Sequence, residues 1–284
     1  MRSQVSYINR EAATRSGERI QFSFGENWLA YVAGLQECHV REAEQAFVRS
    51  TSLDNLTGYT FLDAGCGSGL SSLVACRLQA ERVTSFDVDP HSVACTQQLR
   101  ARFAGEPPRW TVRRLSLLEP HLCEIVGKAR MVCCWGVAHH TGSMWEAIDN
   151  VARCVEDEGW FLLAIYNRTR HSGTWLTIKR LYNRAPSVVK ALLRAVFHAK
   201  VFAGLLVRGQ HPGRFLRDYV RHRGMSYWRD VEDWLGGLPY EYASVEEVGA
   251  FMTARGFELV RVKHAASHGC NEFVLRKRES PNRT

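Results

Sequence analysis

Apolar and mixed segments alternate along most of the chain with the spacing of strands and amphipathic helices. The segments at 131–135 and 160–166 are apolar without a break, as parallel strands buried on both faces are. This order predicts an α/β protein with a doubly wound, Rossmann-like parallel sheet. The expected strands are 60–63, 83–87, 111–115, 131–135 and 160–166, and the helices between them are 70–79, 90–103 and 144–155.

The alternation stops after Tyr166 and resumes near residue 239. A final helix at 244–255 and a pair of strands at 257–263 and 272–276 then return the chain to the sheet. The stretch between them is basic, aromatic and mainly helical, and is expected to cover the carboxyl edge of the sheet. The four parts are a tail with a helical pattern (1–58), a core (59–166), a basic helical insertion or cap (167–238) and the C-terminal part of the core sheet (239–284).

Composition favours a cytoplasmic protein. It has 284 residues, no run of 18 apolar residues and no apolar core of a signal peptide at its start. The nine cysteines are scattered and form no C-x-x-C pair, so we expect reduced thiols and no zinc or other metal.

The net charge of +8 is unevenly distributed. Thirteen Lys or Arg residues and a single acid, Asp218, lie between Asn167 and Gly224, so this segment alone is +12. Such a run is either a solvated face or a surface that attracts an anionic partner or substrate.

A glycine-rich turn follows the first strand. Asp63 precedes glycines at 65, 67 and 69, and a helical pattern begins at once, which is the layout of a nucleoside cofactor site. The third glycine comes one residue too early for a dinucleotide fingerprint, and a carboxylate at Asp63 would repel a pyrophosphate. S-adenosylmethionine (SAM) instead carries an ammonium and a sulfonium group, which a carboxylate favours.

The next two strand ends supply further cofactor candidates. Asp87 ends the second strand, where its carboxylate can accept both ribose hydroxyls; a helix-capping role is the alternative, and Asp89 would then take its place. Ser116 and Leu117 follow the third strand, in a turn that either reads adenine or only connects two elements.

Two adjacent histidines follow the fourth strand. Ligands of open α/β sheets lie beyond the carboxyl ends of the strands, so Trp135 is expected beside the cofactor and His139 or His140 beside the transferred group. A histidine there can take a proton from an attacking nucleophile, and we expect one of the pair to be functional and the other structural. Arg168, after the fifth strand, lies at the same edge and is either catalytic or surface charge.

Taken together, these motifs resemble a bacterial family of class I SAM-dependent methyltransferases. The resemblance implies that Asn27 and Trp28 belong to an N-terminal lid over SAM and that the insertion closes the substrate side. It implies too that the final pair of strands gives the sheet a terminal antiparallel strand. It also implies that an aspartate is usual where this chain has Arg168. The motifs that carry it are Phe24-Gly25-x-Asn27-Trp28, the loop from Asp63 to Gly69, Trp135-Gly136-Val137 with His139-His140-Thr141-Gly142, and Gly269-Cys270-Asn271-Glu272-Phe273.

The expected function is therefore alkyl transfer from SAM, most simply methyl transfer, to an anionic small molecule or peptide-linked substrate. Because Arg168 reverses a charge at the active edge, carboxy-SAM and carboxymethyl transfer to a thiol or other nucleophile form one alternative. A non-catalytic module that binds RNA or an acidic partner through the basic segment forms another, which the complete glycine loop disfavours.

Overall fold

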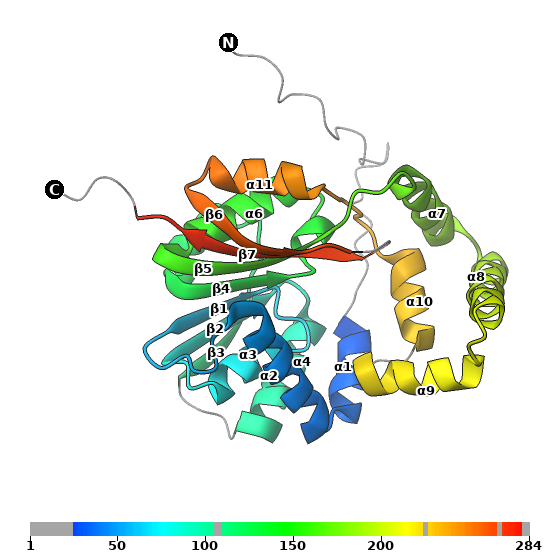
Figure 1. The fold of residues 1–284 in the computed structure, drawn as a ribbon, viewed down its shortest axis with the longest axis horizontal. Coiled ribbons are helices and arrows are strands. Elements are labelled where there is room, and N and C mark those ends of the chain that lie inside the picture. The colour runs from blue at the N-terminus through cyan, green and yellow to red at the C-terminus, as the bar shows by residue number, and fades with distance from the viewer. Residues whose placement is uncertain (1–24, 105–108, 224–226, 266–268, 280–284) are drawn as a thin grey trace, which may run out of the picture.

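A seven-stranded sheet forms the centre of the protein (Figure 1). The computed structural model describes residues 25–104, 109–223, 227–265 and 269–279. The strand order is β3-β2-β1-β4-β5-β7-β6, with β1 to β5 parallel and β7 antiparallel to both of its neighbours. The strands are β1 (Thr60–Ala64), β2 (Arg82–Asp87), β3 (Trp110–Arg114), β4 (Ala129–Trp135), β5 (Val155–Tyr166), β6 (Phe257–Lys263) and β7 (Cys270–Lys277).

Helices cover both faces of this sheet, which confirms the predicted doubly wound architecture (Figure 1). Alternate strand residues serve the two layers, because successive side chains point to opposite faces: Leu62 packs on one side and Phe61 on the other. One layer holds α1 (Gly25–Gly34), α2 (Glu37–Thr51), α3 (Leu70–Arg77) and α4 (Pro90–Ala104), and the other holds α5 (Leu122–Val126), α6 (Met144–Arg153) and α11 (Val245–Thr253).

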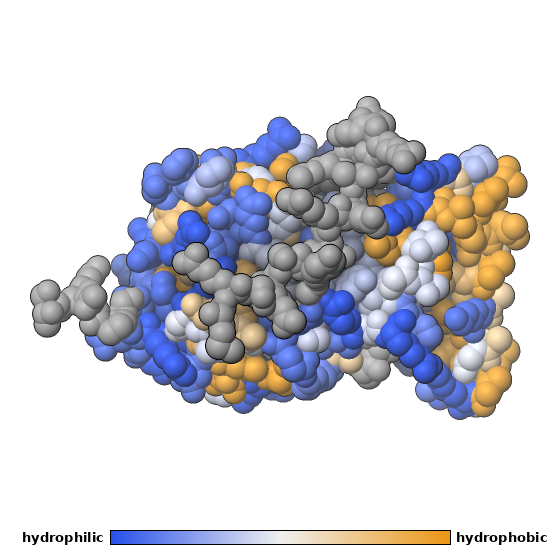
Figure 2. Space-filling model, turned by 90° about the horizontal axis from the view of Figure 1, so that it is seen from above, coloured by the Kyte–Doolittle hydropathy of each residue, from blue (hydrophilic) through white to orange (hydrophobic). Residues whose placement is uncertain are grey.

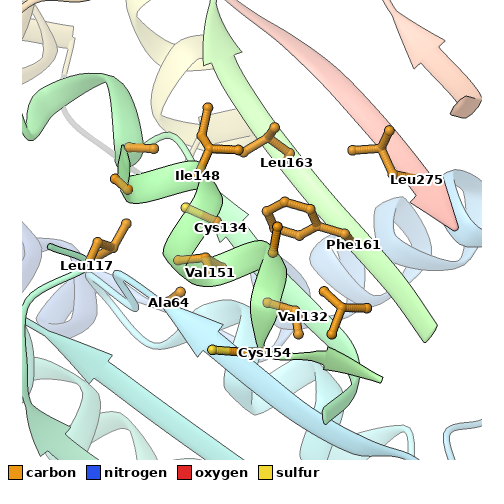
Figure 3. Close-up of a cluster of buried hydrophobic side chains, with 14 of the residues drawn as sticks. Ala64, Leu117, Val132, Cys134, Ile148, Val151, Cys154, Phe161, Leu163 and Leu275 are labelled. Carbon is orange, nitrogen blue, oxygen red and sulfur yellow. The ribbon is translucent and has the colours of Figure 1, made fainter. Parts of the chain in front are cut away.

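The core between the sheet and α6 is formed largely by aliphatic side chains (Figure 3). Ile148 and Val151 of α6 face Val132 of β4 and Phe161 of β5, and all four are fully buried. This packing fixes β4 and β5 in the middle of the sheet, and so determines where the loops at their carboxyl ends lie.

Most predicted boundaries lie within two residues of the observed ones, and two differences are larger. The helical pattern expected within residues 1–58 forms two helices that separate after Gly34, because Gln36 caps a new helix and forms a capping box with His39. Strand β5 begins at Val155 rather than at residue 160, since Val155 already pairs with Ala129 before a register shift in the ladder.

Four helices lie between β5 and α11 and form the cap (Figure 1). They surround a small hydrophobic core of their own, with Tyr182, Tyr227, Val231 and Leu235 at its centre. Within the described residues, none of the helices has both the length and the apolar character needed to cross a membrane. The four are α7 (Ser172–Arg184), α8 (Ser187–Val207), α9 (Pro212–Arg223) and α10 (Tyr227–Gly236).

The chain enters the cap beside the point at which it returns. Asn167 bridges to Ala243, and the fully buried Asn271 of β7 donates from Nδ2 to Asn167 Oδ1 over 3.0 Å. Asn271 Oδ1 accepts from the Ala265 N–H at 2.9 Å. Both ends of this amide are therefore used to hold the base of the cap against the sheet.

Replacing Asn271 with leucine is expected to lower the free energy of unfolding by about 2–3 kcal/mol, because it leaves the Ala265 N–H and the Asn167 Oδ1 without these bonds. Urea unfolding measures the loss. Asn55→Leu is the matched control: this exposed amide accepts one local bond from Thr57, so its loss should stay below about 1 kcal/mol. Equal losses in the two variants would contradict the buried role of Asn271.

Candidate cofactor and acceptor site

The glycine loop between β1 and α3 is packed closely against neighbouring elements. Gly65, Gly67 and Gly69 have φ angles of +79°, +52° and +81°, a region that side chains disfavour. A Cβ on Gly65 would lie 2.5 Å from Val137 after β4, and one on Gly69 would lie 2.8 Å from Thr96 of α4. The protein's own packing therefore requires these glycines, in addition to any approach by a ligand.

Asp87 connects the glycine loop to the end of β2. Its Oδ2 accepts from the Gly67 N–H at 3.0 Å and its Oδ1 accepts from the Asp89 N–H at 2.9 Å. Asp89 in turn accepts from the His91 N–H at 2.9 Å at the start of α4. The helix-capping role thus belongs to Asp89, and the Asp87 carboxylate lies against the glycine loop.

Asp63 is held by a chain of buried hydrogen bonds. The Trp110 Nε1–H donates to Ser85 Oγ at 2.8 Å, the Ser85 and Ser72 hydroxyls lie 2.6 Å apart, and Ser72 donates to Asp63 Oδ2 at 2.6 Å. Because an indole can only donate and a carboxylate only accepts, the hydroxyl protons in this chain all point toward Asp63. The chain fixes the carboxylate from behind and favours its ionised form.

Asp63 and Asp87 are both buried and carry like charges. Burial, together with the charge of Asp87, raises the pKa of Asp63 to about 6, against the opposing bond from Ser72. Burial also raises the pKa of Asp87, against the opposing bonds from Asp89 and Gly67. In the described part of the chain, no cationic side chain pairs with either carboxylate. The site therefore suits a cationic ligand and opposes a pyrophosphate.

The other residues predicted to bind the cofactor, Ser116, Leu117 and Trp135, differ in which of their groups a ligand could reach. The Leu117 side chain is buried in the core and its carbonyl accepts from Asn150, so only its backbone N–H remains a candidate. Ser116 Oγ accepts from the Leu118 N–H at 3.1 Å. Trp135, at the end of β4, leaves 42% of its surface exposed at the carboxyl edge, which is where a ligand would cover it.

Helix α1 lies over the glycine loop. The Trp28 indole is 3.1 Å from the position of a Cβ on Gly67, and Arg102 of α4 binds the Val32 and Leu35 carbonyls at the end of the helix. Asn27 is part of α1, but its side chain lies outside the described residues. Of the two residues predicted for the lid, the structure places the Trp28 side chain beside the glycine loop.

The two histidines lie side by side in a short 3-10 turn after β4 (Ala138–His140). His140 donates from Nδ1 to the Pro239 carbonyl at 2.7 Å, and burial lowers its pKa to about 3. His139 is 1% exposed, its Nδ1 has no hydrogen-bond partner among the described residues, and burial lowers its pKa well below the usual value. Both imidazoles are therefore neutral near pH 7.

Residues of the cap and of β5 surround this pair. The Tyr166 ring lies 4.0 Å from that of His139, and Tyr240 lies 5.3 Å from Tyr166. The buried Lys179 of α7 donates to the Trp234 carbonyl at 2.6 Å and lies 5.0 Å above the Tyr240 ring. Burial lowers the pKa of Lys179 to about 8, and its charge helps to lower the pKa of both histidines.

The segment 239–241, which follows the cap, is hydrogen-bonded to the histidine turn. The Glu241 N–H donates to the His139 carbonyl at 2.9 Å, and the Glu241 carboxylate accepts from the Met144 N–H at the start of α6. With the bond from His140 to Pro239, this segment holds the turn from the cap side. The position of the two histidines therefore depends on the segment that ends the cap.

Arg168, which follows β5, is paired with an acidic side chain. It forms a bidentate ion pair with Glu247 of α11, with N···O distances of 2.8 and 2.9 Å, and stacks on Tyr242. Glu247 also belongs to the capping box of α11 with Ser244. The positive charge of Arg168 is thus balanced by Glu247.

Comparison with known proteins identifies the family. The model of the methyltransferase domain matches residues 39–262. The chain belongs to the methyltransferase domain family. Both the expected family and the expected sheet with its terminal antiparallel strand are confirmed.

Individual relatives are more distant. A ubiquinone biosynthesis O-methyltransferase of Xanthomonas oryzae is 29% identical over 198 residues, which is 68% of this chain and 70% of that protein. A ribosomal protein L11 methyltransferase of Alteromonas mediterranea is 43% identical over 58 residues, so the match spans about a fifth of its length.

Two solved structures share the fold at 13% identity. PKMT2 from Rickettsia typhi has a TM-score of 0.54, with 91% of this chain and 55% of that chain covered. A SAM-dependent methyltransferase from Anabaena variabilis has a TM-score of 0.51, with 92% and 98% covered.

Several residues of this methyltransferase site were not predicted. Ser72, Ser85 and Trp110 come from three elements, and nothing in their local sequence links them to Asp63. For Lys179 the sequence does contain an indication of burial. It is a charged residue at helical spacing within the apolar face formed by Trp175, Ile178 and Tyr182.

The close packing of Gly65 predicts a specific loss of stability. Gly58 and Gly65 share a φ of +79°, but a Cβ on Gly58 would meet nothing within 4 Å. Gly58→Ala should therefore cost only about 1 kcal/mol of backbone strain, while Gly65→Ala should cost a further 1–3 kcal/mol, roughly, from overlap with Val137. Thermal unfolding of both variants checks the difference, and equal losses would contradict it.

Proposed function

We propose that this methyltransferase transfers the methyl group of SAM to the oxygen of an acidic, phenol-like hydroxyl on an aromatic small molecule. The observation that carries the choice of acceptor is a pair of neutral imidazoles beside a buried ammonium, His139 and His140 with Lys179. The match to an O-methyltransferase over about two thirds of both chains supports oxygen as the acceptor atom.

The cofactor loop fits SAM. The two buried carboxylates, Asp63 and Asp87, oppose a phosphate but suit the ammonium and sulfonium groups of SAM, and Asp87 keeps lone pairs that can accept from ribose hydroxyls. Trp28 offers aromatic surface beside Gly67, and Trp135 is exposed at the end of β4. When bound, SAM supplies a methyl group on a sulfonium, which needs no further activation.

His140 serves as the base in this proposal. Because the Pro239 carbonyl can only accept, the His140 Nδ1 carries the proton of the neutral ring and the basic lone pair lies on Nε2. This is the arrangement of a base whose ring is oriented by a second group. His139 packs beneath it at 4.4 Å between ring centroids and has the positioning role.

The environment of His140 also restricts the acceptor. A half-buried imidazole whose pKa is about 3 is a weak base, so it can assist only a hydroxyl that releases its proton readily. The Lys179 ammonium stabilises negative charge that develops on the acceptor oxygen. The rings of Tyr166 and Tyr240 offer stacking surface to an aromatic acceptor.

The expected anionic character of the acceptor thus rests on Lys179 rather than on Arg168. Carboxymethyl transfer from carboxy-SAM rested on a cation at Arg168, and Glu247 balances that charge. We therefore propose methyl transfer.

Asp63→Asn should weaken SAM binding and stabilise the free protein. The folded-state pKa of about 6 lies above the ordinary value of 3.8, so the ionised carboxylate opposes folding increasingly as the pH rises from 4 to above 6. At pH 7.5 the variant should be more stable by about 2 kcal/mol, and its Kd for SAM should rise at least tenfold, roughly. Calorimetry and thermal unfolding test this, with the exposed Asp54→Asn as control. Unchanged SAM affinity would contradict the site.

His140→Gln should lower kcat about 100-fold or more while the KM for SAM stays constant, because only proton transfer is lost. Formation of S-adenosylhomocysteine with a panel of substituted phenols and aliphatic alcohols measures the effect. The wild-type kcat should stay flat down to pH 5, since the pKa of His140 is about 3. Exposed His121→Gln is the control. Full activity of His140→Gln, or a preference for aliphatic alcohols, would contradict the proposal.

A further inference from the structure

The outward face of α8 is apolar over its whole length. Val188, Leu192, Val196, Leu206 and Val207 are between 59% and 89% exposed. They recur along the 21-residue helix and are joined by exposed alanines at positions 191, 195, 199 and 203. Figure 2 shows hydrophobic surface gathered at the end of the molecule where α8 lies in Figure 1.

The opposite face of α8 already has its partners. Leu193, Phe197, Val201 and Phe202 pack against the core of the cap. In Figure 1, α8 is the element farthest from the sheet, with α7, α9 and α10 between it and the rest of the protein. The exposed face therefore packs against neither the cap nor the proposed active site. Exposed apolar area of this kind marks an interaction surface.

The surroundings of this face are strongly basic. Helices α7 and α8 contain no acidic residue, and α9 contains only Asp218. Arg184, Lys200 and Arg208, which lie on or beside α8, are all exposed, as are Arg214 and Arg217 of α9. A partner must therefore offer apolar surface and negative charge together.

We propose that α8 lies parallel to the surface of a bilayer that contains anionic phospholipids, with its outward face in the boundary between headgroups and acyl chains. A lone convex helix of aliphatic residues flanked by cations fits such a surface. Lys190, Arg194 and Lys200 are spread along the helix, so it lies on the membrane and does not span it.

Other partners fit less well. Two copies of this cap would bring like charges together. The outward face of α8 offers Val, Leu and Ala but no aromatic ring on which a nucleic acid base could stack. The inference is independent of the acceptor chemistry, because α8 contributes no residue to the histidine cluster.

Flotation of the full chain with vesicles tests the proposal. The protein should float with phosphatidylcholine vesicles that contain about one third phosphatidylglycerol and should not float with phosphatidylcholine alone. Leu192→Gln combined with Val196→Gln should weaken binding at least tenfold, roughly, and Lys200→Gln or Arg208→Gln should weaken it about fivefold each.

Ile125→Gln combined with Val260→Gln is the matched control, since both residues are exposed aliphatic side chains far from the cap. Thermal unfolding verifies that each variant is folded. Binding that is absent, that does not depend on phosphatidylglycerol, or that survives the α8 substitutions would overturn the proposal. So would a dimer in light scattering that dissociates when Leu192 and Val196 are replaced, because the face would then be used for self-association.

Discussion

The structure depends on two carboxylates buried side by side without a balancing cation in the described residues. Asp87 is held by the N–H of the glycine loop, and Asp63 is held from behind by the chain of Ser72, Ser85 and Trp110. This arrangement costs stability in the free protein, because burial and mutual repulsion both oppose ionisation. In the proposed SAM site, a bound cationic cofactor offsets this cost.

The acceptor side is built differently, by segments that are remote in sequence. The histidine turn follows β4, but the groups that orient it come from the end of the cap, where Pro239 accepts from His140 and Glu241 donates to His139. Val137 of the same loop contacts Gly65, so the cofactor loop and the acceptor cluster touch. A movement of the cap would therefore displace His140 and, through Val137, the glycine loop.

The sequence predicts what is local and leaves open what depends on long-range contacts. The parallel part of the sheet was predicted because strand periodicity is encoded over a few residues, and the family and the terminal antiparallel strand were predicted because several short motifs resemble those of a known family. The pairing of Arg168 with Glu247, 79 residues later, could not be read in this way, nor could the approach of Lys179 to the histidines. The roles of the individual site residues remain predictions that the structure makes more specific.

The most direct test of the carboxylate site is the number of protons released when SAM binds. Calorimetric titration at pH 6 in buffers of different ionisation enthalpy gives this number for the wild type and for Asp63→Asn. The wild type should release about half a proton, because the pKa of Asp63 is about 6 in the free protein and falls when a cation lies beside it. The variant should release almost none. Equal release from both proteins, or proton uptake by the wild type, would contradict the account.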